Sequence, residues 1–150
     1  MAQAETVVGC EFCAIGSGTD GSVEVVAEGK EWTAFFPLKP ATPGHTLLIP
    51  RSHVNDLWEL NEPLSTILMS AVIDVGRAIN VALDPSGMNL ITSAGDVAEQ
   101  TVFHLHFHLL PRWENDGFGP IWTIEDDSSA SKLAERADQV RQAFVQLGSR

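Results

Sequence analysis

The sequence predicts an α+β domain in which helices pack against an antiparallel sheet. Short apolar segments alternate with turn residues, which is typical of strands joined by tight turns. One longer segment carries apolar residues at helical spacing, which indicates a helix with a single buried face. Because strands outnumber helices and mostly follow one another directly, we expect antiparallel pairing of neighbours.

Five strands are expected, and turn residues bound most of them. They span residues 22–27, 32–38, 45–49, 88–92 and 102–110. Gly29-Lys30 is typical of a hairpin turn between the first two strands. Residues 39–44 contain two prolines and a glycine, which break regular pairing before the third strand.

Three helices are expected besides the strands. Residues 54–60 predict a short helix, and residues 61–83 predict a long central helix. The long helix should begin at Asn61-Glu62-Pro63, because a proline at the first helical position loses no hydrogen bond. Its apolar stripe comprises Leu64, Ile67, Leu68, Ala71, Val72, Val75, Ile79 and Ala82. Residues 128–147 predict a C-terminal helix with one mainly apolar side.

Length and composition indicate one domain over residues 1–150, without internal repeats. The apolar runs are too short to span a bilayer, and residues 1–8 lack the features of a signal peptide, so we expect a cytoplasmic protein without membrane contact. Twenty acidic and nine basic residues give a net charge of -11. This charge argues against a nucleic-acid polymer as partner, whereas a small nucleotide needs only a few local donors.

Cys10 and Cys13 form a Cys-x-x-Cys pair near the N-terminus. A structural disulfide is disfavoured in a reducing compartment, and a redox pair needs a βαβ setting, whereas residues 16–21 are typical of a loop. The spacing therefore predicts half of a zinc site, provided that two further ligands exist. The alternative is a pair of spectator cysteines near the surface.

Three histidines, His104, His106 and His108, alternate along the fifth predicted strand. Residues two apart on a strand point to the same face, roughly 6.5–7 Å apart, so the rings should share one face, partly solvated. The other face carries Phe103, Leu105, Phe107 and Leu109, which we expect to enter the core. A neutral imidazole is a nucleophile toward phosphorus near pH 7, and its neighbour can bind phosphate oxygens.

Two other interpretations of these histidines remain open at this point. One is a polar strand face that is simply solvated, and the other is a three-histidine metal site. Gln100 and Thr101 stand just before the strand, after a loop. An amide and a hydroxyl suit a phosphate or a leaving group better than a metal shell.

Two long motifs resemble those of the histidine-triad (HIT) family. The first is His104-Leu105-His106-Phe107-His108-Leu109-Leu110, preceded by Glu99-Gln100-Thr101-Val102 where the family usually has Gly-Gln-(Ser/Thr)-Val. The second is Pro40-Ala41-Thr42-Pro43-Gly44-His45-Thr46-Leu47-Leu48-Ile49-Pro50-Arg51-Ser52-His53, similar to Pro-x-x-Pro-Gly-His-x-Leu-φ-Ile-Pro-x-x-His. Both stand in the family's order and spacing, and the resemblance covers Cys10 to Trp113.

The resemblance implies a HIT-like fold, with a five-stranded antiparallel sheet, one long central helix and a C-terminal helix, in a homodimer. It implies hydrolysis or transfer at the α-phosphate of nucleotides. His106 would form a covalent nucleotidyl intermediate, and His108 would contact the phosphate and the leaving group. The further positions that it assigns to phosphate or nucleoside binding are His45, Gln100, Thr101, Ser93, Phe35 and Leu38.

Family members that carry an N-terminal Cys-x-x-Cys pair bind zinc with it and with two histidines. The resemblance thus implies structural Zn²⁺ held by Cys10, Cys13, His53 and His104. Two cysteines and two histidines make a closed, four-coordinate set. Such a site would tie the N-terminal segment, residues 1–21, to the sheet.

The sequence departs from the family pattern in the substrate pocket. Pro37 stands where relatives usually place Asp or Asn against the ribose hydroxyls, Ser93 where Asn or Gln is common, and Glu99 in place of glycine. Pro111-Arg112 after the triad is more similar to the dinucleotide-cleaving and phosphorylase-type branches. Arg112 either assists a second phosphate or base or is a surface arginine.

The leading hypothesis is a nucleotidyl hydrolase or transferase of the phosphoramidase or dinucleoside polyphosphate hydrolase type. The alternatives are a non-catalytic nucleotide-binding HIT protein with a structural zinc site, and a purely structural zinc module.

Overall fold

The structure, a computed structural model, describes residues 5–148. Residues 1–4 of the predicted N-terminal segment, and residues 149–150, lie outside the described residues. The chain divides into two compact units, one ending at Phe118 and the other beginning at Gly119. The single-domain organisation over residues 1–150 stays a prediction.

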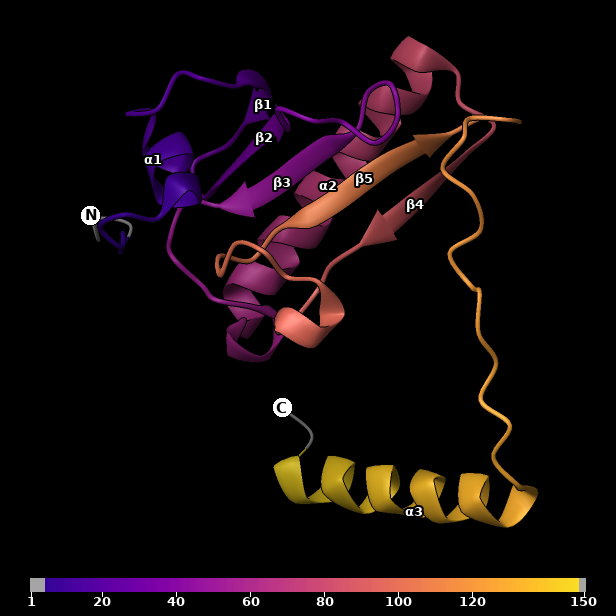
Figure 1. The fold of residues 1–150 in the computed structure, drawn as a ribbon. Coiled ribbons are helices and arrows are strands. Elements are labelled where there is room, and N and C mark those ends of the chain that lie inside the picture. Colours follow the sequence, from indigo (N-terminus) through magenta and orange to yellow (C-terminus); the bar gives the residue numbers. More distant parts are fainter. Residues whose placement is uncertain (1–4, 149–150) are drawn as a thin grey trace. The chain divides into compact units, whose positions relative to one another are not determined.

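The first unit is built on a five-stranded sheet. Its strands are β1 (Glu24–Glu28), β2 (Trp32–Phe36), β3 (Thr46–Pro50), β4 (Gly87–Ile91) and β5 (Phe107–Arg112). The strand order is β1-β2-β3-β5-β4, and every neighbouring pair is antiparallel (Figure 1). The predicted α+β class and the five-stranded antiparallel sheet are therefore confirmed.

Helix α2 (Glu62–Leu83) covers one face of the sheet (Figure 1). Asn61 caps it by accepting a hydrogen bond from the backbone N–H of Leu64, and Pro63 lies in the first turn as predicted. By length and composition alone α2 could cross a membrane. Its apolar stripe, however, contacts β2, β3 and β5. The buried cluster between helix and sheet comprises Leu68, Ala71, Val72, Val75, Ile79, Ala34, Leu48, Leu105, Phe107 and Leu109.

The opposite face of the sheet carries a helix that the sequence did not predict. Helix α1 (Glu11–Ser17) includes Gly16 and Ser17, which were expected to lie in a loop. With only seven residues it is too short for a periodic pattern to reveal. Cys10 caps its N-terminus, and Phe12 and Ile15 pack on the sheet. The apolar cluster beneath α1 comprises Phe12, Ile15, Phe35, Leu47 and Ile49.

Strand β5 begins at Phe107 rather than at the predicted Val102. The β3–β5 register would place Leu105 opposite Pro50, which has no backbone N–H to donate. The backbone N–H of Leu105 bonds the carbonyl of Val54 instead. The segment before Phe107 is thus irregular.

Side chains complete the hydrogen bonding of this irregular segment. His104 Nε2 lies 2.9 Å from the carbonyl oxygen of Pro50, and the hydroxyl of Thr92 donates to the carbonyl of His106 at 2.8 Å. The prediction that the strand already includes His104 and His106 is therefore wrong, because both precede β5. Their rings still lie with that of His108 on the side of the sheet that α1 covers. Phe103, expected in the core, is 53% exposed, whereas Leu105 is buried as predicted.

Three further elements complete the described chain. The helix predicted over residues 54–60 is a single 3-10 turn, η1 (Leu57–Glu59), and a second such turn is η2 (Asp96–Ala98). The second unit contains α3 (Ala130–Leu147), which confirms the C-terminal helix predicted over residues 128–147. Arg136 of α3 bonds Asp126 and Ser128 just before the helix.

Candidate functional site

The four predicted metal ligands converge, although they come from three distant segments. Cys10 and Cys13 lie at the start of α1, His53 follows β3, and His104 precedes β5. Their four ligand atoms lie within 4.8 Å of one another. The Sγ atom of Cys13 is 3.3 Å from His53 Nδ1 and 3.5 Å from His104 Nδ1. The Sγ atom of Cys10 is 3.5 Å from the same His104 nitrogen.

These separations fit a tetrahedral zinc ion. Zn–S bonds of about 2.3 Å and Zn–N bonds of about 2.0–2.1 Å place sulfur and nitrogen ligands about 3.6 Å apart. Burial raises the pKa of the Cys13 thiol, so a thiolate at this position calls for a cation beside it. The cluster therefore has the donor set and the dimensions of a closed metal site.

Hydrogen bonds behind the two ligand histidines determine which nitrogen faces the thiols. His53 Nε2 lies 3.1 Å from Asn55 Oδ1, and the amide nitrogen of Asn55 donates to Glu59, which fixes the orientation of that amide. His104 Nε2 lies 2.9 Å from the carbonyl oxygen of Pro50. Because both oxygens only accept, each ring is protonated on Nε2 and keeps the Nδ1 lone pair free for a metal.

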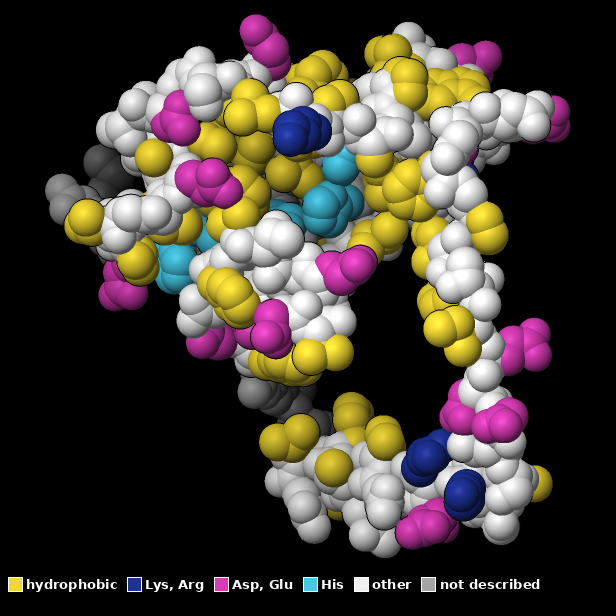
Figure 2. All heavy atoms as spheres, in the orientation of Figure 1, with side chains coloured by type: hydrophobic (Ala, Val, Ile, Leu, Met, Phe, Trp, Pro, Cys, Tyr) yellow, Lys and Arg dark blue, Asp and Glu magenta, His cyan; other side chains and the backbone are white. Residues whose placement is uncertain are grey.

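The other three histidines line a pocket of about 600 Å³, here called the histidine pocket. It lies between α1 and the sheet, on the face opposite α2. Figure 2 shows histidine side chains in a hollow of this face, bordered by apolar side chains. The predicted site residues that line it are Phe35, Leu38, His45, Thr101, His106 and His108.

A chain of hydrogen bonds fixes the protonation of His45 and His108. The backbone N–H of Ala41 donates to His45 Nδ1 at 3.0 Å, so the neutral ring carries its proton on Nε2. That Nε2–H donates to His108 Nδ1 at 2.9 Å. The neutral His108 ring consequently carries its own proton on Nε2. The tight turn that delivers His45 depends on Gly44, whose φ of +76° favours glycine.

His106 has the tautomer opposite to that of His45 and His108. Its Nδ1 lies 2.7 Å from the carbonyl oxygen of His104, so the proton is on Nδ1 and Nε2 keeps a free lone pair. The rings of Phe12 and His108 contact it edge-on, at centroid distances of 5.2 Å and 4.9 Å. The ring is only 5% exposed, although the sequence led us to expect partial solvation.

Burial keeps these rings neutral. It is the main cause that lowers the pKa of His106, against an opposing effect of the hydrogen bond to His104. Burial, reinforced by the neighbouring His106 and His45, lowers the pKa of His108 to about 4. Burial likewise lowers the pKa of His45. At pH 7 the pocket thus holds an unprotonated Nε2 on His106 beside an Nε2–H on His108.

Two predicted phosphate-site residues do not line the histidine pocket. Gln100 is buried, and its amide accepts from Gly95 N–H at 2.8 Å and donates to the Asn55 carbonyl at 2.6 Å. It thereby joins the η2 loop to the residue that orients His53. Ser93 also lies outside the lining. Glu99 adopts φ +64°, a left-handed conformation that favours the glycine usual in relatives.

Several residues of the histidine pocket were missed by the sequence analysis. Phe12 and Ile15 come from the unpredicted helix α1, so no pattern pointed to them. Glu11, Asp20 and Lys39 bring charged groups to the lining. Pro37 lines the pocket as the resemblance implied, and it offers no side-chain acceptor there.

Arg112 makes hydrogen bonds to the neighbouring strand β4 and to the segment that follows β5. Its guanidinium bonds Asp116 at 2.5 Å and 3.1 Å and Asn89 at 2.8 Å, and it lies 4.6 Å from the centre of the Phe118 ring. Arg112 is not part of the histidine-pocket lining. Its contacts favour the interpretation as a structural arginine over a role at a second phosphate.

Comparison with known proteins places these observations in a family. A family model described as "HIT domain" matches residues 21–115. "Protein hit" of Bacillus subtilis is 37% identical over 119 residues, which cover 79% of this chain and 81% of that protein. The "Adenosine 5'-monophosphoramidase hnt1" of Schizosaccharomyces pombe is 32% identical over 75% of this chain and 82% of its own.

Solved structures agree with the sequence comparison. A HIT family protein from Bacillus anthracis superposes with a TM-score of 0.82 at 35% identity, covering 93% of this chain and 99% of that one. A zinc-bound histidine triad family protein from Mycobacterium smegmatis superposes with a TM-score of 0.69 at 30% identity, covering 91% and 98%.

The protonation pattern of the pocket can be measured directly. Nitrogen-resolved NMR of the imidazoles at pH 7 should show His106 as the Nδ1–H form, and His45 and His108 as Nε2–H forms. Because its pKa is lowered, His108 should stay neutral as the pH falls through 6.5 and take up its proton near pH 4. The unfolded chain binds that proton earlier, so stability should decrease over this interval.

A His45→Phe variant is the matched control, since it removes the donor to His108 Nδ1 and leaves His106 bonded to the His104 carbonyl. The His108 ring should then exchange between tautomers while His106 keeps its form. An Nε2–H signal from His106 in the unaltered protein would contradict the assignment.

Proposed function

The chain belongs to the HIT domain family, and we propose that it is a nucleotide hydrolase or transferase that cleaves at the α-phosphate through a covalent nucleotidyl intermediate on His106. One observation carries the proposal: the buried ring of His106 and the adjacent, partly buried ring of His108 present opposite forms of Nε2 to one pocket. A lone pair attacks, and an N–H stabilises charge. The phosphoramidase activity named for the fission yeast relative supports this reaction class.

The proposed reaction has two balanced steps. In the first, His106 Nε2 attacks the α-phosphorus, and the bond from phosphorus to the leaving group breaks. The leaving group departs with the bonding electrons and takes a proton from water. In the second, the hydroxide so formed attacks the phosphorus, the P–Nε2 bond breaks, and the nucleoside monophosphate is released. Inorganic phosphate in place of water would make the same site a transferase.

His108 and His45 act on the charge that develops during both steps. The Nε2–H of His108 is the donor placed to bond a phosphate oxygen or the departing atom. His45 holds that ring in the donor form through the bond to Nδ1. Phe12, Phe35 and Leu38 provide apolar surface for the nucleoside.

The observation that favours a non-catalytic nucleotide-binding protein is Pro37, which leaves the pocket without the acceptor that relatives usually place there. Turnover and covalent labelling separate the two candidates, because only the enzyme forms an adduct.

We predict that His106→Asn lowers kcat by about three orders of magnitude or more while nucleotide still binds. Asparagine retains a donor near the position of Nδ1, for the bond to the His104 carbonyl, but has no atom in place of Nε2. Rapid quench with an α-³²P-labelled adenosine phosphoramidate should trap a labelled protein in the wild type and none in the variant.

The matched control is His108→Asn, which keeps the nucleophile and should still form the adduct, more slowly. Bound nucleotide with neither adduct nor turnover in the wild type would replace the proposal with the non-catalytic alternative.

We also propose that Cys10, Cys13, His53 and His104 hold one structural Zn²⁺. The support is the donor set, the 3.3–3.5 Å sulfur–nitrogen distances and the two histidine tautomers. The zinc-bound mycobacterial neighbour adds to it. The ion would tie the start of α1 to the segments at residues 53 and 104.

Metal analysis should find about one zinc per chain in protein purified without chelators, and Cys10→Ala should lose it and melt several degrees lower. His45→Phe, which alters a histidine outside the cluster, should keep the metal. A wild-type protein without zinc would refute this assignment.

We further propose that the protein acts as a homodimer. The edge strand β4 and the end of α2 expose apolar side chains, including Leu90 at 46% and Val81 at 86%. Light scattering in solution should give twice the chain mass, and a monomer at micromolar concentration would contradict this. The cytoplasmic location stays a prediction that cell fractionation would check.

A further inference from the structure

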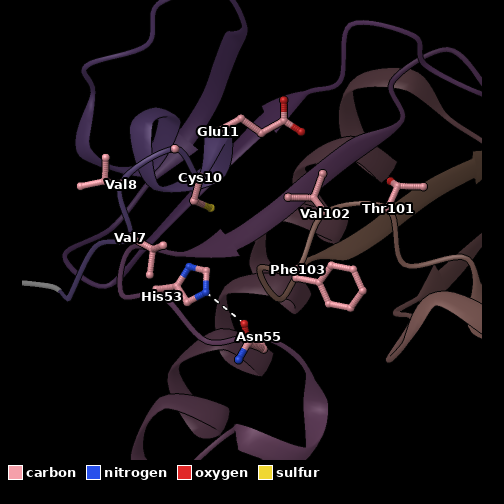
Figure 3. A pocket seen from close by; sticks show the side chains of 10 residues that line it. Val7, Val8, Cys10, Glu11, His53, Asn55, Thr101, Val102 and Phe103 are labelled. Carbon is pink, nitrogen blue, oxygen red and sulfur yellow. Dashed lines mark hydrogen bonds between the residues drawn. The ribbon is translucent and has the colours of Figure 1, made fainter.

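A second pocket, of about 510 Å³, adjoins the histidine pocket on the side of the metal cluster. Residues 7–11, His53, Asn55 and residues 101–103 line it. Figure 3 shows Glu11, from the start of α1, on one side and Thr101, Val102 and Phe103 across from it. Glu11, Thr101 and Val102 line both pockets, so the two spaces share a wall.

The proposed reaction requires a place for the leaving group. In phosphoryl transfer the attacking and leaving atoms lie roughly in line, so the leaving group departs away from His106. The apolar wall of the histidine pocket, with Phe12, Phe35 and Leu38, suits the nucleoside. The leaving group therefore needs separate space, and the second pocket adjoins the histidine pocket at Thr101 and Val102.

The lining of the second pocket favours a positively charged ligand. Among the described residues that line it, Glu11 is the one carboxylate, and none is a lysine or an arginine. Val7, Val8 and Phe103 contribute apolar surface. A lone carboxylate beside apolar walls attracts an ammonium group on an alkyl chain and repels a polyphosphate.

We propose that the second pocket receives the leaving group and that Glu11 selects leaving groups that carry a positive charge. The substrates would then be nucleoside 5'-phosphoramidates of cationic amines rather than dinucleoside polyphosphates. This inference rests on the proposed function. Glu11 also lies in the first turn of α1, where a carboxylate stabilises the helix, so the test must measure selectivity and not only rate.

The wild-type test uses a series of adenosine 5'-phosphoramidates that differ at the far end of the amine. Their leaving groups are 1,5-diaminopentane, pentylamine and 5-aminopentanoate, and the unsubstituted phosphoramidate gives the baseline. We expect kcat/KM to be about 3- to 10-fold higher for the cationic amine than for the neutral one, and lower still for the anionic one. The preference should decrease at high salt, because Glu11 is exposed.

Substitutions at Glu11 should change the order of these substrates. Glu11→Gln should bring the ratio of cationic to neutral substrate to about one, and Glu11→Lys should favour the anionic substrate. The matched control is Glu62→Gln, which removes the same charge from the first residue of α2, outside both pockets, and should leave the ratio unchanged. The zinc content of each variant is measured alongside.

The outcomes separate the inference from the proposed function. Equal cleavage of the series by the wild type, a preference that persists at high salt, or an unchanged ratio in Glu11→Gln with zinc retained would overturn the role of Glu11 and leave the proposed function intact. Failure to cleave even the unsubstituted phosphoramidate would overturn the proposed function itself. Should the Glu11 variants not fold, the wild-type series and its salt dependence decide.

Discussion

Backbone groups decide which nitrogen of His45, His104 and His106 carries a proton, and the rest of the site depends on that. The N–H of Ala41 can only donate, and the carbonyls of His104 and Pro50 can only accept. His45 in turn donates to His108 Nδ1, so that ring also adopts a fixed tautomer. Burial lowers the pKa of the rings of the histidine pocket, so these rings stay neutral near pH 7 and keep their tautomers.

The metal cluster and the histidine pocket share one short stretch of chain, residues 104–106. The ring of His104 faces the cysteines, while its carbonyl orients His106. Phe12 contacts both rings, at centroid distances of 6.0 Å and 5.2 Å. Because the stretch precedes the regular pairing of β5, these contacts take over the positioning that a strand ladder would otherwise supply. A change in the geometry of the metal cluster would therefore alter the position of the His106 ring.

Most of the sheet and helix α2 could be predicted from the sequence, because local spacing and turn residues determine them. Of the cluster residues, spacing indicated Cys10 and Cys13, whereas His53 and His104 were assigned through the resemblance to the HIT family. Asn61 and Pro63, for example, mark the start of α2 by capping chemistry alone. The course of residues 102–106 could not be predicted, since it depends on Pro50 in a neighbouring strand. Helix α1 could not be predicted because it is too short to show a periodic pattern. Without that helix, nothing in the sequence indicated that Glu11 lines a pocket, and the second pocket was not predicted.

The separation of the cluster residues along the chain has a consequence for the order of assembly. Cys13 is 40 residues from His53 and 91 from His104. Closing such loops costs conformational entropy, which the pairing of β3 with β5 and the packing of α1 on the sheet help to offset. A metal ion would meet its complete set of ligands only after these strands have come together. Metal uptake would then be a late step of folding, limited to chains whose sheet has already formed.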